Sequence, residues 1–313
     1  MTMCRWSRRE FLRLAGGAAG VAVSGGLSSI LGSAGAAGAA ATVTVASGAS
    51  PQDNVRRAVA ALGGIKAFVS RGDVVVLKPN IGWDRTPEQA ANTDPGVVIA
   101  VAEMCLSAGA KEVRVFDRSC NEPRRCYASS GIQDAVERFG KRNGMADAVR
   151  IYHVEDRKFR RTSIPGALAL KEWDFYRDAL EADKIVNVPV AKHHSLATVT
   201  LGLKNMIGVM GGNRGQIHFN LSDCLVDINR RLPSRLTVID ATRVLLRNGP
   251  SGGNLADVQA VGKVFASADI VAADVVAAEK IFGMKPRDVA HIQKALESGI
   301  GISSPAQIRV VEA

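Results

Sequence analysis

The chain has 313 residues, 47% of them hydrophobic and 22% charged, with a formal net charge of +10 at pH 7. These values exclude a disordered chain and are sufficient for one large hydrophobic core or two smaller ones. The positive charge would attract an anionic partner, but no basic run with interleaved aromatic residues indicates a nucleic-acid site. Beyond the N-terminal segment, no apolar run reaches the length of a membrane span. We therefore expect no nucleic-acid partner and no stable membrane span in the mature protein.

The N-terminal segment has the features of a twin-arginine (Tat) export signal. Arg8 and Arg9 precede Phe11 and Leu12, and a Gly/Ala-rich segment of low hydrophobicity with small-residue cleavage patterns follows. The alternatives are an ordinary Sec signal and an uncleaved anchor. We predict that residues 1–41 are a Tat-type signal peptide, that the Tat machinery is a partner, and that the protein is periplasmic or secreted. Removing four arginines and one glutamate with this segment would reduce the net charge from +10 to +7.

Four cysteines follow this segment: Cys105, Cys120, Cys126 and Cys224. Their spacing contains no CxxC pair and no ferredoxin-type run, so we expect no iron–sulfur cluster and no structural zinc site. Cys105 and Cys224 lie in apolar contexts that are typical of a core. In an oxidising compartment, Cys120 and Cys126 are close enough along the chain for a disulfide, which leaves a redox role open.

Strand and helix patterns alternate along the rest of the chain. The expected strands are at residues 42–45, 73–77, 113–116, 149–153, 185–190, 235–239, 261–266 and 307–311. The expected helices are at residues 54–62, 95–108, 130–143, 219–231, 270–282 and 287–298, with a hairpin within 157–172. This order predicts an α/β class, with a mostly parallel sheet or sheets and helices on both faces. Residues 42–313 would form this domain, with two subdomains meeting near residues 180–190 as an alternative.

Polar residues follow several of these strands, at the end where open α/β sheets bind ligands. Lys78 and Asn80 follow the second strand, Asp117 the third and Asp240 the sixth, and the fifth would open into a loop with Lys-His-His at 192–194. Because the carboxyl ends of parallel strands share one edge, we expect these side chains to converge on a ligand crevice. Lysines there would bind a carboxylate or phosphate. Histidines would transfer protons or bind a metal.

Most of these candidates have a structural alternative. Lys78 could extend to solvent from a strand end, and Asp117 and Asp240 could cap helices. Successive residues of an extended chain point in opposite directions, which favours His194 over His193 for the site.

Further candidates lie on the segment that follows. Lys204 and Asn205 belong to a second element, where Lys204 is surrounded by apolar residues. A buried lysine without a partner is costly, so a functional pairing is favoured. His218 follows a glycine-rich turn and suits a surface position as well as a ligand position. We predict His194 and Lys204 as catalytic residues and His218 as a metal ligand. The predicted ligand-binding residues are Lys78, Asn80, Lys192, Asn205, Asp117 and Asp240.

Several motifs, in order along nearly the whole mature chain, resemble one family. They include Val-Leu-Lys78-Pro-Asn80, Asn92-Thr-Asp94-Pro95, Lys192-x-His194-Ser195, Leu203-Lys204-Asn205-x-x-Gly208, Val-Ile-Asp240 and Ser267-x-Asp269. On these residues the chain resembles the DUF362 family, whose function is largely undefined. Some members carry an appended ferredoxin domain, and this chain lacks the cysteines that its clusters would need.

A more distant likeness is to the nickel-pincer lactate racemase family (DUF2088). There a histidine, a cofactor-tethering lysine and a metal-binding histidine follow one another, and His194, Lys204 and His218 have a similar order. The likeness implies a metal or a metal-containing nucleotide as a candidate cofactor, with Lys204 and His218 in those roles. Leu-Gly-Leu before Lys204 departs from the family's paired glycines, so the cofactor stays unknown at this point.

These observations predict an exported protein that binds a small anionic ligand or a metal cofactor at a Lys/His/Asp crevice. In the enzyme interpretation it catalyses a proton transfer of the racemase or isomerase kind, and His194 abstracts or donates the proton. The alternatives are a non-catalytic binding or carrier protein and a redox partner that uses Cys120 and Cys126.

Overall fold

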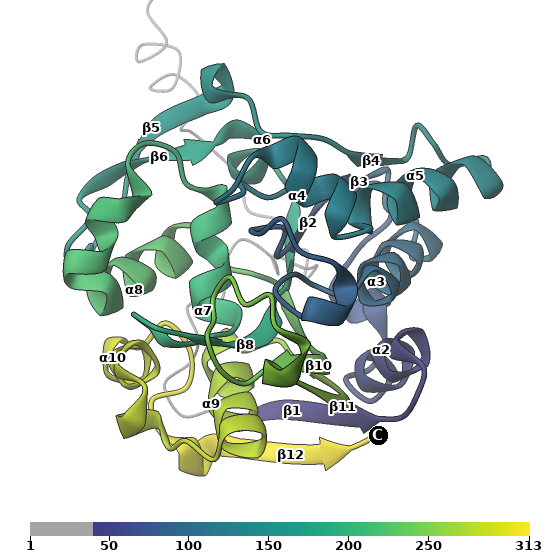
Figure 1. Ribbon diagram of the computed structural model, residues 1–313. Helices are drawn as coiled ribbons and strands as arrows, with labels where there is room; N and C mark the ends of the chain where they lie inside the picture. The colour runs from purple at the N-terminus through teal and green to yellow at the C-terminus, as the bar shows by residue number, and fades with distance from the viewer. Residues whose placement is uncertain (1–39) are drawn as a thin grey trace, which may run out of the picture. The chain divides into compact units, whose positions relative to one another are not determined.

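The computed structural model describes residues 40–313, which are built around a ten-stranded sheet (Figure 1). Its strands are β1 (Ala41–Ser47), β2 (Val74–Pro79), β3 (Glu112–Val115), β4 (Val149–Ile151), β7 (Lys184–Val188), β8 (Val190–His194), β9 (Thr198–Thr200), β10 (Leu236–Leu245), β11 (Val258–Ser267) and β12 (Ile308–Glu312). The main path of the sheet is β12-β1-β11-β10-β7-β2-β3-β4, and β8 pairs with β10 and β9 beside it.

Most neighbouring strands in this sheet are parallel. The pairs β10·β7, β7·β2, β2·β3 and β3·β4 all run in the same direction, as do β10·β8 and β1·β12. Only β11 and β9 run against their neighbours. The predicted α/β class with a mostly parallel sheet is therefore confirmed, and the carboxyl ends of β2 and β3 lie side by side.

Helices cover both faces of the sheet, as predicted. They are α2 (Pro51–Ala60), α3 (Pro95–Ser107), α4 (Pro123–Ser129), α5 (Ile132–Arg142), α6 (Arg177–Leu180), α7 (Gly202–Asn205), α8 (Leu221–Arg231), α9 (Ile270–Phe282) and α10 (Ala290–Ser298). Successive strand residues point to opposite faces. Val75 and Leu77 accordingly join a buried cluster with α2, α3 and α5, while Val76 joins another with α8, α9 and α10 (Figure 1).

A separate two-stranded hairpin lies within the charged segment after β4. Its strands are β5 (Phe159–Ser163) and β6 (Glu172–Tyr176), which pair antiparallel. The predicted hairpin is present, but its second strand begins at Glu172 and so lies almost entirely beyond the predicted range of 157–172. Phe175 also forms an isolated bridge with Met210, so the hairpin contacts the segment that follows α7.

The chain around Pro189 differs from its predicted course. Proline has no N–H to donate, and β7 ends at Val188. The chain then continues as β8, so both histidines lie on a strand and not in a loop. The strand predicted at 235–239 extends to Leu245, which places Asp240 inside β10 and not at its end. β7 itself is an interior strand of the sheet, between β10 and β2.

The predicted export signal at residues 1–41 lies almost entirely outside the described residues, so Tat export stays a prediction. From residue 40 onward, no helix combines the length and the apolar character needed to cross a membrane.

The start of α3 generates a first prediction. Asp94 is its N-cap and accepts a hydrogen bond from the Gly96 N–H at 2.8 Å, while Arg243 pairs with the same carboxylate at 2.5 Å. Asp94→Ala should lower the free energy of unfolding by about 1–2 kcal/mol, because α3 loses its capping acceptor. Asp94→Asn keeps that acceptor and should recover about half of the loss. Urea unfolding of the three proteins measures this, and equal stability of Asp94→Ala and wild type would contradict it.

Candidate functional site

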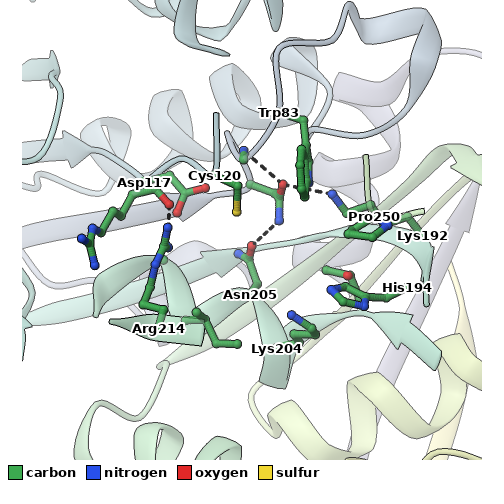
Figure 2. Close-up of a pocket in the computed structure, with 15 residues that line it drawn as sticks. Trp83, Asp117, Cys120, Lys192, His194, Lys204, Asn205, Arg214 and Pro250 are labelled. Atoms are coloured by element: carbon green, nitrogen blue, oxygen red, sulfur yellow. Dashed lines mark hydrogen bonds between the residues drawn. The ribbon is translucent and has the colours of Figure 1, made fainter. Parts of the chain in front are cut away.

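A pocket of about 430 Å³, counting the space at its open mouth, lies beyond the carboxyl ends of β2 and β3 (Figure 2). β8, β9 and α7 close its other sides. Six of the residues predicted from the sequence line it: Asn80, Asp117, Lys192, His194, Lys204 and Asn205. The strand-end crevice expected from a parallel sheet therefore exists, and it brings most of the predicted residues together.

Three other predicted residues lie outside the pocket wall. Lys78 is fully buried behind Asp117. The His218 ring lies beside the His194 ring, with 6.4 Å between their centroids. The prediction that Asp240 binds the ligand is wrong. Its carboxylate accepts hydrogen bonds from the Asp94 N–H at 2.7 Å and from the Thr242 N–H and hydroxyl. Because β10 continues past Asp240, this side chain anchors the start of α3 and does not reach the ligand crevice.

Lys78 and Asp117 form a buried ion pair at the base of the pocket. Their charged atoms are 2.9 Å apart, and the two side chains are 0% and 4% exposed. Asp117 also accepts the Ile81 N–H at 2.6 Å, and the Lys78 ammonium donates to the Pro79 carbonyl at 2.5 Å. Burial lowers the pKa of Lys78, and the adjacent carboxylate opposes this shift. Lys78 thus neutralises Asp117 and does not face the open space of the pocket.

A chain of side-chain amides holds α7 against this pair. Asn205 donates to the Lys78 carbonyl at 3.0 Å and to the Asn187 side chain at 2.8 Å, and accepts from Asn80 at 3.0 Å. Asn187 is fully buried on β7 and in turn donates to the Gly202 carbonyl at 2.9 Å. Sequence reasoning missed Asn187, although an amide inside an apolar strand run is a usable signal.

Two lysines face the pocket and have no acidic partner among residues 40–313. Lys192 is 1% exposed; its ammonium donates to the Asn80 side chain and the Ala91 carbonyl, and lies 5.9 Å from the centroid of the Trp83 ring. Among the residues from 40 onward, the Lys204 ammonium has neither a hydrogen bond nor an ion pair. Burial lowers the pKa of Lys192 to about 7 and that of Lys204 to about 8. These are the groups that an anion would stabilise most.

Two arginines that sequence reasoning missed complete the cationic wall. Arg214 donates to the carbonyls of Arg118 and Ser119 at 2.7 and 2.8 Å. Arg118 donates to the Met210 and Gly212 carbonyls and lies over the Phe159 ring at 5.4 Å. Neither forms an ion pair with a carboxylate of the described chain. Arg118 directly follows Asp117, and this position after a strand end could have identified it from the sequence as a candidate pocket residue.

Hydrogen bonds assign the tautomer of His194. Its Nδ1 accepts the Leu196 and Ala197 N–H groups at 3.1 and 3.2 Å, so the neutral ring carries its proton on Nε2. Burial, with a contribution from the Lys204 charge, lowers its pKa to about 2. His194 is therefore a neutral hydrogen-bond donor at this site.

His218 has the opposite arrangement. Its Nδ1 lies 3.3 Å from the Gly215 carbonyl, which can only accept, so Nδ1 holds the proton and Nε2 keeps a lone pair. Burial also lowers the pKa of His218. His193 turns away, as expected from the alternation along β8, and accepts the Gly249 N–H at 3.1 Å.

The donor set does not fit a metal held by the protein alone. Within residues 40–313, no group of three or more His, Cys, Asp and Glu side chains could hold a metal ion. His218, the predicted ligand, lies beside the His194 ring but belongs to no such group among these residues.

The two cysteines considered for a disulfide are free thiols. Cys126 is buried on α4, with its sulfur 3.7 Å from the Gly82 carbonyl, whereas Cys120 is exposed and lines the pocket. The short helix α4, which sequence reasoning missed, places Cys126 in the core. This arrangement does not favour the redox alternative.

Comparisons with known proteins agree with the family resemblance. A model described as a domain of unknown function, DUF362, matches residues 75–279. Thylakoid-associated protein sll1697 of Synechocystis is 28% identical over 231 residues, which cover 71% of this chain and 67% of that protein.

Two solved structures show distant likenesses. The lactate racemase apoprotein of Thermoanaerobacterium thermosaccharolyticum aligns with a TM-score of 0.46 at 12% identity, over 79% of this chain and 57% of that one. A Thermotoga maritima protein aligns with a TM-score of 0.34 at 12% identity, over 66% of this chain and 54% of that one. The chain therefore spans little more than half the length of either structure, and no residue role follows from them.

Gly208 provides a test of the buried ion pair. A Cβ atom there would lie 1.8 Å from the Asp117 carboxylate and 2.6 Å from the Lys78 ammonium. Gly208→Ala should lower the free energy of unfolding by about 3 kcal/mol, because neither buried group can move away without losing the other. Gly215→Ala, where one flexible side-chain atom lies at 3.1 Å, is the matched control and should change stability by less than about 1 kcal/mol. Wild-type stability of Gly208→Ala in urea would show that the pair is not rigidly held.

Proposed function

The chain belongs to the DUF362 family, and from the pocket we propose that it binds a small organic anion with a carboxylate or phosphate group. One observation carries this proposal. Four cationic side chains, Lys192, Lys204, Arg118 and Arg214, line the pocket, and none is ion-paired with a carboxylate of residues 40–313. The carboxylate that does line the pocket, on Asp117, is already paired with Lys78.

Energetics support an anionic ligand over a neutral one. A buried ammonium group without a counter-charge is costly, and the lowered pKa values of Lys192 and Lys204 reflect that cost. An anion in the pocket would supply the missing negative charge and accept hydrogen bonds from both lysines. Arg118 and Arg214 are held in place by backbone carbonyls, so they need no reorganisation to meet it.

The setting of this activity is also a proposal. The twin arginines at positions 8 and 9 support export through the Tat pathway to the periplasm or beyond. The Tat machinery and the small anion are then the two partners of the chain.

Anion affinity should depend on pH through the two lysines. Both must be protonated to attract an anion, and their pKa values are about 7 and about 8. Raising the pH through this range removes the charges, so affinity for malate, whose two carboxylates are ionised at both pH values, should be about tenfold weaker at pH 9 than at pH 6.5. Isothermal titration calorimetry at the two pH values measures this.

Two lysine variants test whether binding depends on the pocket lysines or only on the net charge of the protein. Lys204→Gln should weaken phosphate binding about tenfold at pH 6.5, because it removes a cation without an internal partner. Lys66→Gln alters an exposed lysine on a 3₁₀ turn that does not line the pocket, and should leave affinity unchanged. Equal affinity of wild type and Lys204→Gln would refute the proposed anion site.

A catalytic version of this function is favoured by the two histidines. His194 presents an N–H donor and His218 an unprotonated nitrogen, on rings 6.4 Å apart whose planes differ by 24°. Such a pair supports proton transfer next to a carboxylate: His218 would accept the α-proton, and His194 would donate to the developing oxyanion. Lys192 and Lys204 would stabilise the negative charge that forms. The alternative, a carrier, needs the lysines but neither histidine.

Proton exchange distinguishes enzyme from carrier. Incubation of lactate or malate with the protein in D₂O should remove the α-proton signal from the NMR spectrum if the site is catalytic. His194→Ala and His218→Ala should each slow this exchange about 100-fold. Malate affinity in both variants should stay within about threefold of wild type, because the lysines supply most of the binding energy. Unchanged exchange in His194→Ala would contradict the catalytic version, and binding without exchange in wild type would identify a carrier.

A further inference from the structure

Cys120 is an exposed thiol inside the cationic pocket, and the proposed anion binding does not use it. The other cysteines from residue 40 onward, Cys105, Cys126 and Cys224, are buried. Cys120 lines the pocket together with Lys192, Lys204 and other residues (Figure 2). A reagent that enters this pocket therefore meets a single accessible sulfur of the described chain.

The loop that carries Cys120 is held from several sides. The Cys120 N–H donates to the Gly82 carbonyl at 2.8 Å, and the Arg118 N–H donates to the Gly208 carbonyl at 3.0 Å. Arg214 donates to the Ser119 carbonyl at 2.8 Å. These bonds connect the loop after β3 to the loop after β2 and to the segments that follow α7. They hold the thiol in a defined place, which a reacting group requires.

The surroundings of Cys120 attract negative charge. Cys120 lines the same pocket as the cations Lys192, Lys204, Arg118 and Arg214, and the carboxylate of that pocket, on Asp117, is paired with Lys78. The same cations draw anionic reagents into the pocket.

An independent observation points to a ligand in the same place. The Thr200 hydroxyl lines the pocket, is 3% exposed and has no hydrogen-bond partner among residues 40–313. A buried hydroxyl without a partner is uncommon, because leaving it unpaired is costly. A ligand oxygen in the pocket would satisfy it.

We propose that Cys120 is a nucleophile that bonds covalently to an electrophilic carbon of an anion held by Lys192 and Lys204, such as an α,β-unsaturated carboxylate. With that class, the sulfur–carbon bond forms at the β-carbon and the C=C π pair moves to the α-carbon. The α-carbon then takes up one proton, and the thiol loses one. The net change is addition of S–H across the double bond, which needs no oxidant or reductant. This inference rests on the proposed anion site and adds a covalent step to it.

Two alkylating probes that differ in charge test the inference. Iodoacetate and iodoacetamide both form a sulfur–carbon bond with loss of iodide, but only iodoacetate is an anion. Their rates at Cys120 in the full chain are measured by peptide-resolved mass spectrometry and divided by the rates for glutathione. The iodoacetate/iodoacetamide ratio should be about tenfold above that of glutathione, because the cationic wall concentrates the anion. High salt should reduce this preference.

Variants and a second cysteine serve as controls for the alkylation rates at Cys120. Lys204→Gln should lower the iodoacetate rate about fivefold and leave the iodoacetamide rate within about twofold. Buried Cys126, six positions along the chain, should stay unlabelled and so reports that the protein is folded. Cys120→Ser should lose the adduct on this peptide, and inorganic phosphate should protect the wild-type thiol.

The outcomes separate this inference from the proposed function. A charge preference equal to that of glutathione, in a protein that binds phosphate, overturns the role of Cys120 and leaves the anion site standing. Absence of both phosphate binding and charge preference overturns the two together. Phosphate binding by Cys120→Ser similar to that of wild type shows that the anion site does not depend on the thiol.

Discussion

The buried ion pair between Lys78 and Asp117 is the constraint on which the pocket depends. Burying two charges is favourable only when geometry and further hydrogen bonds compensate for lost hydration. Here the pair joins the ends of two neighbouring parallel strands, and the Ile81 N–H and the Pro79 carbonyl complete it. It leaves no room for a side chain at Gly208. It also neutralises the pocket's carboxylate, so the cations that face the open space stay unpaired.

Much of this arrangement could be predicted from local patterns. Lys78, Asn80 and Asp117 follow compact β-branched runs, and parallel pairing necessarily brings the ends of such strands together. The helix Ile270–Phe282 was predicted to the residue, because a mostly apolar segment begins directly after the capping side chain of Asp269. The alternation of side chains along an extended chain was enough to prefer His194 over His193.

Other features depend on tertiary contacts that no local pattern contains. Asp240 looked like the end of a strand, but pairing with β11 continues β10 to Leu245 and moves its carboxylate to the start of α3. Arg118 and Arg214 reach the pocket only because backbone carbonyls distant in the chain hold them. The nitrogen that carries the proton is set in His194 by two backbone N–H groups and in His218 by one carbonyl. Such contacts appear only when the chain is folded.

Protonation of the pocket lysines has opposite effects on the stability of the empty protein and on the proposed anion binding. The pKa of Lys192 falls from 10.5 to about 7 on folding, so the folded protein binds fewer protons than the unfolded chain between these values. The cost of burying this lysine is therefore full below about pH 7 and disappears as the pH rises toward 10.5. The proposed anion would reverse the balance, because it would stabilise the protonated lysine and bind best where the empty pocket is least favourable. The cationic pocket thus lowers the stability of the empty protein, which is the arrangement expected of the anion site proposed above.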